Sequence, residues 1–178
     1  MVAEDLLGRV LRGREAWFQA KAPLMAKAPE ATWVELSLNI PGWPKCSQWT
    51  KPVFDAAIDA IFTATGSAAT LAIENDAGHF CLFNVPLSAP GAKAAAVGLE
   101  ASHPWGRLWD IDVYAGSQKL PREITGASER RCLACYRPHS ECIASRRHPR
   151  EALRLAAKLI ATTPPSSPQT APDLGDRP

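Results

Sequence analysis

The sequence predicts an α+β domain with a four-stranded mixed sheet of the split βαβ type and helices on one face. Two observations carry this prediction. Segments of β-branched and apolar residues alternate with segments of helical periodicity, in the order β-α-β-β-α-β. The central pair of strands is separated by residues 75–78, whose Asn, Asp and Gly favour a tight hairpin. An N-terminal helix precedes this pattern, and a Cys/His-rich helical segment follows it.

The individual elements follow from local patterns. Residues 3–21 carry an imperfect helical stripe of apolar side chains that two glycines interrupt. A Pro-rich loop over residues 40–47 forbids regular structure and leads into the next helix. The predicted strands are residues 32–39, 69–74, 79–85 and 109–113, and the further predicted helices are residues 51–64, 92–102 and 149–160.

Composition limits the domain organisation and the function classes. The chain has 178 residues, 46% of them hydrophobic, and a formal net charge of +2. We therefore expect one catalytic domain over residues 1–161 and a disordered Pro- and Ser-rich tail over residues 162–178. No apolar run approaches the ~20 residues that span a bilayer, and the acidic N-terminus is unlike a signal peptide. Five cysteines, an odd number, suggest a reducing compartment, so the expected location is the cytoplasm.

The strand at residues 109–113 carries the first candidate site. Side chains alternate faces along a strand, so Asp110 and Asp112 point the same way. Two adjacent carboxylates repel unless a positive charge lies between them. A hard cation such as Mg²⁺ takes carboxylate oxygens and leaves positions for substrate phosphates. The alternative is the solvated face of an edge strand.

Two neighbouring loops supply groups that suit a phosphorylated substrate. Before the aspartate strand, Gly106 allows close backbone approach, Arg107 offers a planar fork for phosphate oxygens, and His103 is a candidate base or phosphate donor. In the Pro-rich loop, Lys45 and Ser47 are candidates for holding a phosphate. The alternative for that loop is a stiff turn with a solvated lysine.

A second constellation lies in residues 131–148, a possible zinc-knuckle-like segment. Cys132, Cys135, Cys142 and His148 make an ordinary four-ligand set for structural Zn²⁺, with His139 as an alternative ligand. The competing interpretations are cysteines that pack as small hydrophobes or a redox pair. A proline soon after the C-x-x-C pair disfavours the redox pair.

Taken together, these motifs resemble the apo-citrate lyase phosphoribosyl-dephospho-CoA transferases, also called holo-citrate lyase synthases. Four blocks carry the resemblance in the same order along the chain, and the long His-Pro-x-Gly-Arg-x-x-Asp-x-Asp block is the most specific. The blocks are residues 36–47, residues 99–113 with that motif, residues 120–122 ending in Arg122, and the Cys/His segment from residue 130 to residue 148.

The resemblance implies a nucleotidyltransferase. Enzymes of this family attach 2'-(5''-triphosphoribosyl)-3'-dephospho-CoA to a serine of the acyl-carrier subunit of citrate lyase, and pyrophosphate leaves. The implied partners are therefore that subunit and the CoA derivative, without nucleic acid or membrane. The basic residues that follow Arg122 would suit an acidic carrier protein.

The resemblance also implies residue roles. Mg²⁺ held by Asp110 and Asp112 would bridge triphosphate oxygens and offset charge on the departing pyrophosphate. Glu100 or His103 would take the serine proton, and the sequence does not choose between them. Polyphosphate clamping falls to Arg107, Lys45 and Arg122.

Two other functions remain open at this point. A zinc-knuckle module could bind nucleic acid through the arginine-rich segment, although the net charge of +2 is low for that purpose. A metal-dependent phosphohydrolase could use the same aspartates to direct water at a phosphate.

Overall fold

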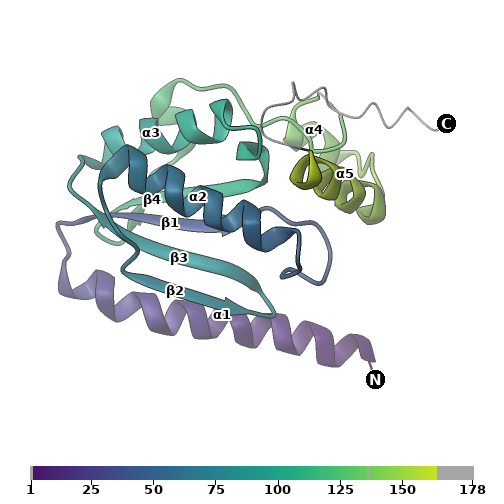
Figure 1. The fold of residues 1–178 in the computed structure, drawn as a ribbon, viewed down its shortest axis with the longest axis horizontal. Helices are drawn as coiled ribbons and strands as arrows, with labels where there is room; N and C mark the ends of the chain where they lie inside the picture. Colours follow the sequence, from purple (N-terminus) through teal and green to yellow (C-terminus); the bar gives the residue numbers. More distant parts are fainter. Residues whose placement is uncertain (1, 136, 164–178) are drawn as a thin grey trace.

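One sheet of five strands forms the centre of the protein (Figure 1). The computed structural model describes residues 2–135 and 137–163. Its strand order is β2-β3-β1-β4-β5, and every hydrogen-bonded pair is antiparallel. The strands are β1 (Thr32–Leu38), β2 (Leu71–Asn75), β3 (Gly78–Val85), β4 (Trp109–Ala115) and β5 (Gln118–Lys119).

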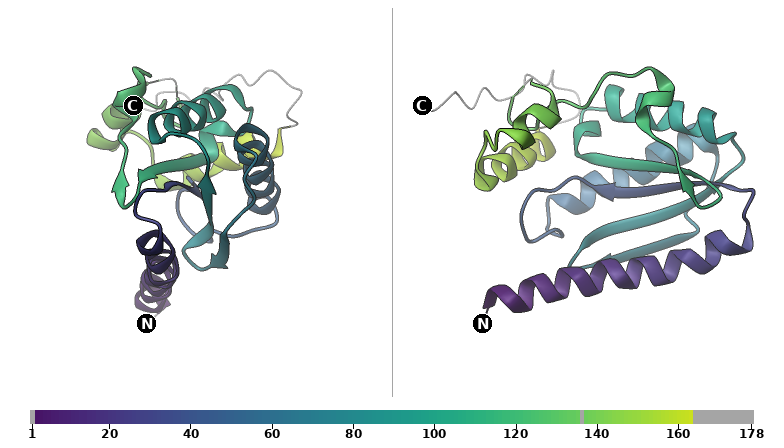
Figure 2. Two further views of the ribbon diagram at one scale, coloured as in Figure 1. Left: turned by 90° about the vertical axis from the view of Figure 1, so that its left-hand side faces the viewer. Right: turned by 180° about the vertical axis from the view of Figure 1, so that it is seen from behind.

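Helices cover both faces of this sheet, as the views in Figure 2 show. In the described part of the chain, no helix is both long enough and apolar enough to cross a bilayer. The helices are α1 (Val2–Lys27), α2 (Thr50–Thr65), α3 (Ala89–Ser102), α4 (His139–Ala144) and α5 (Arg150–Thr162), with 3₁₀ turns η1 (Gly106–Leu108) and η2 (Arg122–Thr125).

The predicted α+β class is confirmed, but the sheet differs from the prediction in two details. Strands β1 and β2 run in the same direction, yet β3 lies between them, so no parallel pair forms and the sheet is not mixed. The fifth strand has only two residues, which is too short to leave a sequence pattern. Residue 162 still belongs to α5, and residues 164–178 of the predicted tail lie outside the described residues.

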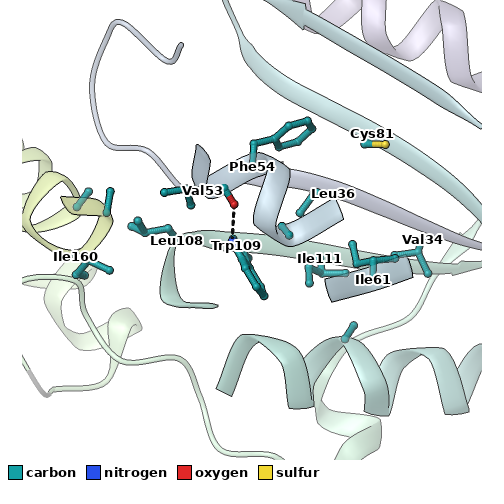
Figure 3. Close-up of a cluster of buried hydrophobic side chains, with 14 of the residues drawn as sticks. Val34, Leu36, Val53, Phe54, Ile61, Cys81, Leu108, Trp109, Ile111 and Ile160 are labelled. Carbon is teal, nitrogen blue, oxygen red and sulfur yellow. Dashed lines mark hydrogen bonds between the residues drawn. The ribbon is translucent and has the colours of Figure 1, made fainter. Parts of the chain in front are cut away.

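The larger hydrophobic core lies between the sheet and helices α2 and α3 (Figure 3). Leu36 of β1 is paired with Ile111 of β4, and Val34 with Val113, so these side chains lie side by side on the face that α2 and α3 cover, as the period of two requires. The buried ring of Trp109 donates its indole N–H to the carbonyl of Val53 on α2 at 3.0 Å. This bond satisfies a buried donor and fixes the start of β4 against α2.

Helix α1 packs on the opposite face, so the expectation of helices on one face only is wrong. Trp17 and Met25 of α1 meet Trp33 of β1 and Leu82 of β3 in a second buried cluster. Glu35, on the same face, accepts a hydrogen bond of 2.5 Å from the indole N–H of Trp17. Strand β1 is therefore buried on both faces from Thr32 to Leu36, and the charge of the buried Glu35 on the α1 side is paired with Lys21.

Helix α1 is longer than the predicted residues 3–21, because it continues through Pro23 to Lys27. One of the two glycines that interrupt its apolar stripe, Gly13, serves packing. A Cβ added at Gly13 would lie 2.5 Å from Oδ1 of Asn75 and 3.0 Å from atoms of Ala77. Asn75 in turn donates a hydrogen bond of 3.0 Å to the Gly13 carbonyl. Gly13 thus lets α1 approach the β2–β3 hairpin closely.

Gly13→Ala should destabilise the protein although alanine is the better helix former. The added methyl overpacks the hairpin contact, which costs about 1–3 kcal/mol. Gly98→Ala on α3 is the matched control, because nothing lies within 4 Å of its added Cβ, and it should stabilise the protein by about 0.5–1 kcal/mol. Urea unfolding measures the free energy of unfolding of both variants. Equal changes of the same sign in the two variants would contradict the role of the close contact at Gly13.

Candidate functional site

The carboxylate of Glu100 joins three segments at the end of α3. Its side chain is 5% exposed, and it accepts a hydrogen bond of 2.9 Å from the backbone N–H of Ile111 on β4. Arg122 contacts its other oxygen at 2.6 Å, and Arg130 forms a second ion pair with it. These donors compensate the burial of the charge and hold the segment from Arg122 to Arg130 against β4.

Asp110 and Asp112 lie on one face of β4, as the strand period predicts. Asp110 pairs with Nη1 of Arg130 at 2.8 Å, and Asp112 pairs with Nζ of Lys119 at 2.5 Å. Their side chains are 40% and 20% exposed. The positive charges that the carboxylate pair requires are thus supplied by two basic side chains.

A cavity of about 270 Å³ opens beside Glu100. Four arginines contribute to its wall, together with the backbone at Gly106. Guanidinium groups converging on one concave surface favour a polyanionic ligand such as a phosphate chain. The four arginines are Arg107, Arg122, Arg130 and Arg131, and Asn39 and His139 also line the cavity.

Neither aspartate lines this cavity directly. Arg130 connects Asp110 to the cavity, because the same guanidinium contacts both Asp110 and Glu100. Asp110 of the predicted pair is therefore linked by one side chain to the cavity that Arg107 and Arg122 line, whereas Lys45 of the predicted phosphate clamp lies elsewhere.

His103 lies on the covered side of β4, away from the aspartates. Its ring stacks on Trp109 with centroids 4.2 Å apart, and its Nδ1 accepts a hydrogen bond of 3.0 Å from the backbone N–H of Trp105. Burial lowers the pKa of His103, so the ring is neutral near pH 7. The structure does not bring His103 into the wall of the arginine-lined cavity.

Gly106 is required by a contact within the chain. A Cβ at this position would lie 2.3 Å from the carbonyl oxygen of Glu100. Only glycine lets η1 fold back onto the end of α3, which places Arg107 next to Glu100 in the cavity wall.

The Pro-rich loop places Lys45 in a different cavity, of about 760 Å³, between α1 and α5. The ammonium of Lys45 donates to the carbonyl of Ile40. Burial lowers the pKa of Lys45, and the positive charges of Arg14, Arg154 and Arg150 lower it further. Several cations crowded around one cavity indicate a second region that would attract an anion.

Ser47 occupies a structural position at the start of α2. Its backbone N–H donates to Oγ1 of Thr50 at 2.7 Å, and the Thr50 hydroxyl returns a hydrogen bond of 2.9 Å to the Ser47 carbonyl. The residues that line the Lys45 cavity do not include Ser47. The two candidates from this loop are therefore not brought together in one pocket.

The Cys/His segment forms a compact donor cluster. The side-chain donor atoms of Cys132, Cys135, Cys142 and His148 all lie within 4.8 Å of one another. Sγ of Cys135 is 3.5 Å from Sγ of Cys142 and 3.3 Å from Nε2 of His148. A tetrahedral zinc site with Zn–S bonds of about 2.3 Å needs donor separations of this order. The cluster could therefore hold a metal ion, and His148 is its imidazole donor instead of His139.

The acidity of the thiols differs within this cluster. Burial, reinforced by the neighbouring thiols, raises the pKa of Cys142 to about 12. Burial also raises the pKa of Cys135, but the backbone N–H of Arg137 and the thiols of Cys142 and Cys132 bring it below its ordinary value. Cys135 therefore loses its proton more readily than Cys142, whose deprotonation needs a cation to offset the charge.

A third cavity, of about 410 Å³, connects these regions. His139 lines both this cavity and the arginine-lined one, while Gly42 and Arg150 line both this cavity and that of Lys45. We call the lining of these three neighbouring cavities, which extends from Arg122 to Lys45, the basic surface.

Sequence reasoning missed three residues of this region. Arg130 is predicted only as part of the basic segment and of the Cys/His block, although its place two residues before the Cys-x-x-C pair is a usable signal. His139 was considered only as a metal ligand. Lys93 of α3 is 5% exposed, and burial lowers its pKa while Asp112 raises it. An isolated lysine in an alanine-rich helix gave no sign of that burial.

Comparisons with known proteins identify the family of the chain. The sequence profile of the family described as apo-citrate lyase phosphoribosyl-dephospho-CoA transferase matches residues 6–163. A probable transferase of this name from Streptococcus pyogenes serotype M3 is 31% identical over 162 residues, covering 86% of this chain and 84% of the relative.

Two further relatives carry the same name. The probable transferase from Vibrio cholerae serotype O1 is 35% identical over 128 residues, covering 67% of this chain and 71% of the relative. The transferase from Citrobacter koseri is 32% identical over 123 residues, covering 65% of this chain and 66% of the relative. The family profile spans the sheet, the arginine-lined cavity and the Cys/His cluster, and the chain belongs to the apo-citrate lyase phosphoribosyl-dephospho-CoA transferase family of enzymes.

Proposed function

We propose that this protein transfers the phosphoribosyl-dephospho-CoA part of 2'-(5''-triphosphoribosyl)-3'-dephospho-CoA to a serine of the acyl-carrier subunit of citrate lyase. The serine oxygen forms a bond to the α-phosphorus, the bond from that phosphorus to the bridging oxygen breaks, and pyrophosphate leaves. The observation that carries the proposal is the arginine-lined cavity beside Glu100 and the aspartate strand in a member of this family.

The residues of the cavity bind and orient the triphosphate in this proposal. Arg107 and Arg130 contact phosphate oxygens, and their planar forks fix the chain in line with the incoming hydroxyl. Glu100 positions Arg122 and Arg130, since both its oxygens already accept hydrogen bonds from those arginines. This occupancy supports a positioning role for Glu100 and disfavours it as the base that takes the serine proton.

Asp110 and Asp112 suit Mg²⁺ by the chemistry of their donors. Both are carboxylates on one face of β4, and their side chains remain accessible. The bound ion would offset the charge of the pyrophosphate leaving group. Lys119 and Arg130 can exchange from the aspartates to the phosphates at little cost, because partly exposed ion pairs contribute only about 0–1 kcal/mol.

We assign Zn²⁺ to the Cys/His cluster as a structural ion. Three thiols and one imidazole favour zinc over the hard cations that carboxylates select. The four donors complete a tetrahedral shell, so this site leaves no position for substrate. The ion would hold in place the segment that begins with Arg130 and Arg131 and contains His139.

The transfer reaction is tested directly with purified components. The protein is incubated with the CoA derivative, Mg²⁺ and the apo carrier subunit, and intact mass and pyrophosphate are followed together. Equimolar mass gain and pyrophosphate release are expected, and a Ser→Ala acceptor should abolish both. Pyrophosphate release without any carrier would support a phosphohydrolase instead. Retention of random RNA on a filter at moderate salt would support a nucleic-acid module.

Asp110→Asn and Asp112→Asn should each abolish transfer while the protein stays folded. Each change removes one charge from the proposed magnesium pair, and a partly exposed carboxylate contributes little to packing. Asp59→Asn, an exposed position on α2, is the matched control and should keep full activity. Activity within about threefold of wild type in both site variants would exclude the metal role, since a required ligand costs far more than that factor.

Arg107→Lys should lower kcat/KM for the CoA derivative strongly. The bidentate fork is replaced by a point charge, and a lost charged hydrogen bond costs about 1.5–3 kcal/mol, or roughly 10- to 150-fold in rate. Arg12→Lys, an exposed arginine of α1, serves as the control. An unchanged kcat/KM in Arg107→Lys would place this residue outside the substrate site.

Cys135→Ser should remove one equivalent of zinc from the protein and lower its melting temperature. Metal binding is coupled to folding of the segment that supplies the ligands. The fraction that remains folded should retain residual transfer activity, because the ion does not contact substrate. Cys81→Ala removes a thiol elsewhere and should leave the zinc content unchanged. Elemental analysis decides the point, and identical zinc in wild type and Cys135→Ser would refute the assignment.

A further inference from the structure

A second group of metal-ligating side chains lies outside the basic surface. Sγ of Cys46, a carboxylate oxygen of Glu74 and a ring nitrogen of His79 all lie within 4.8 Å of one another. They come from three segments: the Pro-rich loop, β2 and β3. The expected functions of this protein use none of the three residues.

The β2–β3 register brings two of these donors together. Glu74 and His79 are directly opposite one another in the antiparallel pair, so their side chains are nearest neighbours on one face. Nδ1 of His79 is 3.1 Å from Oε2 of Glu74. Because backbone pairing holds Glu74 and His79 opposite one another, their proximity does not depend on the chance position of flexible surface side chains.

The orientation of His79 is set by buried partners. Its side chain is 2% exposed, and its ring stacks on Phe54 with centroids 5.1 Å apart. Nε2 lies 3.1 Å from the hydroxyl of the fully buried Thr50. Metal-binding histidines characteristically have their second ring nitrogen held by such a partner, which directs the first nitrogen at the ion. Here Nδ1 is directed toward Glu74.

The other two donors leave a route for an ion. Cys46 is half-buried, and its thiol donates a hydrogen bond of 3.3 Å to the carbonyl of Asn75 at the hairpin. The Glu74 side chain is 54% exposed. An ion can therefore enter from the solvent side, past Glu74, and meet the imidazole and the sulfur at the inner end.

We propose that Cys46, Glu74 and His79 form a second zinc site. Sulfur, nitrogen and oxygen donors in one set are compatible with Zn²⁺, whereas Mg²⁺ and Ca²⁺ take oxygen ligands. The three side chains leave a fourth position for water. The bound ion ties the Pro-rich loop to the β2–β3 hairpin, directly beside Lys45.

Metal stoichiometry of the full-length protein tests this site. Wild type and Cys46→Ser are dialysed against the same zinc buffer, and bound zinc is measured by elemental analysis. Wild type should hold one equivalent more than Cys46→Ser. Replacement by Co²⁺ should show visible and sulfur-to-metal absorption that is partly lost in Cys46→Ser. Cys81→Ala, whose thiol lies outside both clusters, should match wild type in both measurements.

Glu74→Gln provides a second measurement that does not depend on the loop. Its exposed side chain can be replaced without disturbing the core, and zinc affinity at this site should fall at least about 10-fold, as loss of a ligand requires. Equal zinc content in wild type and Cys46→Ser, or equal affinity in wild type and Glu74→Gln, would overturn the proposal. Cys135→Ser removes the zinc equivalent of the other cluster, so the two sites are distinguished. Because the experiment measures zinc and not transfer activity, its outcome is independent of the proposed reaction.

Discussion

The buried carboxylate of Glu100 is the contact on which the arginine-lined cavity depends. A charge at this depth is costly unless it is fully hydrogen-bonded and paired. The N–H of Ile111 and the guanidinium groups of Arg122 and Arg130 meet that requirement together. Loss of Glu100 would leave two arginines beside one another without their shared counter-charge. The same contact therefore stabilises the fold and places the basic groups at the cavity.

The position of this carboxylate also follows from the sheet. Strand β4 pairs with β5 only at Tyr114 and Ala115, so the N–H of Ile111 faces the edge without a strand partner. An exposed edge strand is a liability for association with other chains. Glu100 caps this N–H, and the segment held by its arginines covers the edge. Edge protection and assembly of the site are thus achieved by one side chain.

Sequence patterns predict local structure well here and long-range contacts poorly. The alternation around Asp110 and Asp112 specified their common face, because the period of a strand is a local property. The spacing of Cys132, Cys135, Cys142 and His148 specified a cluster for the same reason: all four lie within one short segment.

The features that were missed depend on contacts between distant segments. The role of Arg130 requires knowing that it meets Glu100, 30 residues earlier in the chain. The antiparallel sheet follows from β3 lying between β1 and β2, which is a property of topology. The glycines of helix α1 only interrupt its apolar stripe in the sequence, because the reason for a glycine at position 13 lies in its tertiary contact with the hairpin.

Each of the two donor clusters takes donors from a segment with little regular structure, the Cys/His segment in one case and the Pro-rich loop in the other. Helix α4 has six residues, far fewer than an isolated helix needs in water, and the Pro-rich loop has no regular structure before Thr50. Each segment nevertheless carries groups that line the basic surface, His139 in one and Lys45 in the other. The hydrophobic core holds each segment at only a few points, Leu133 and Cys142 in one and Ile40 in the other. Metal ligation at the proposed sites would add rigidity from a few side chains and leave the arginines and Lys45 directed at their cavities.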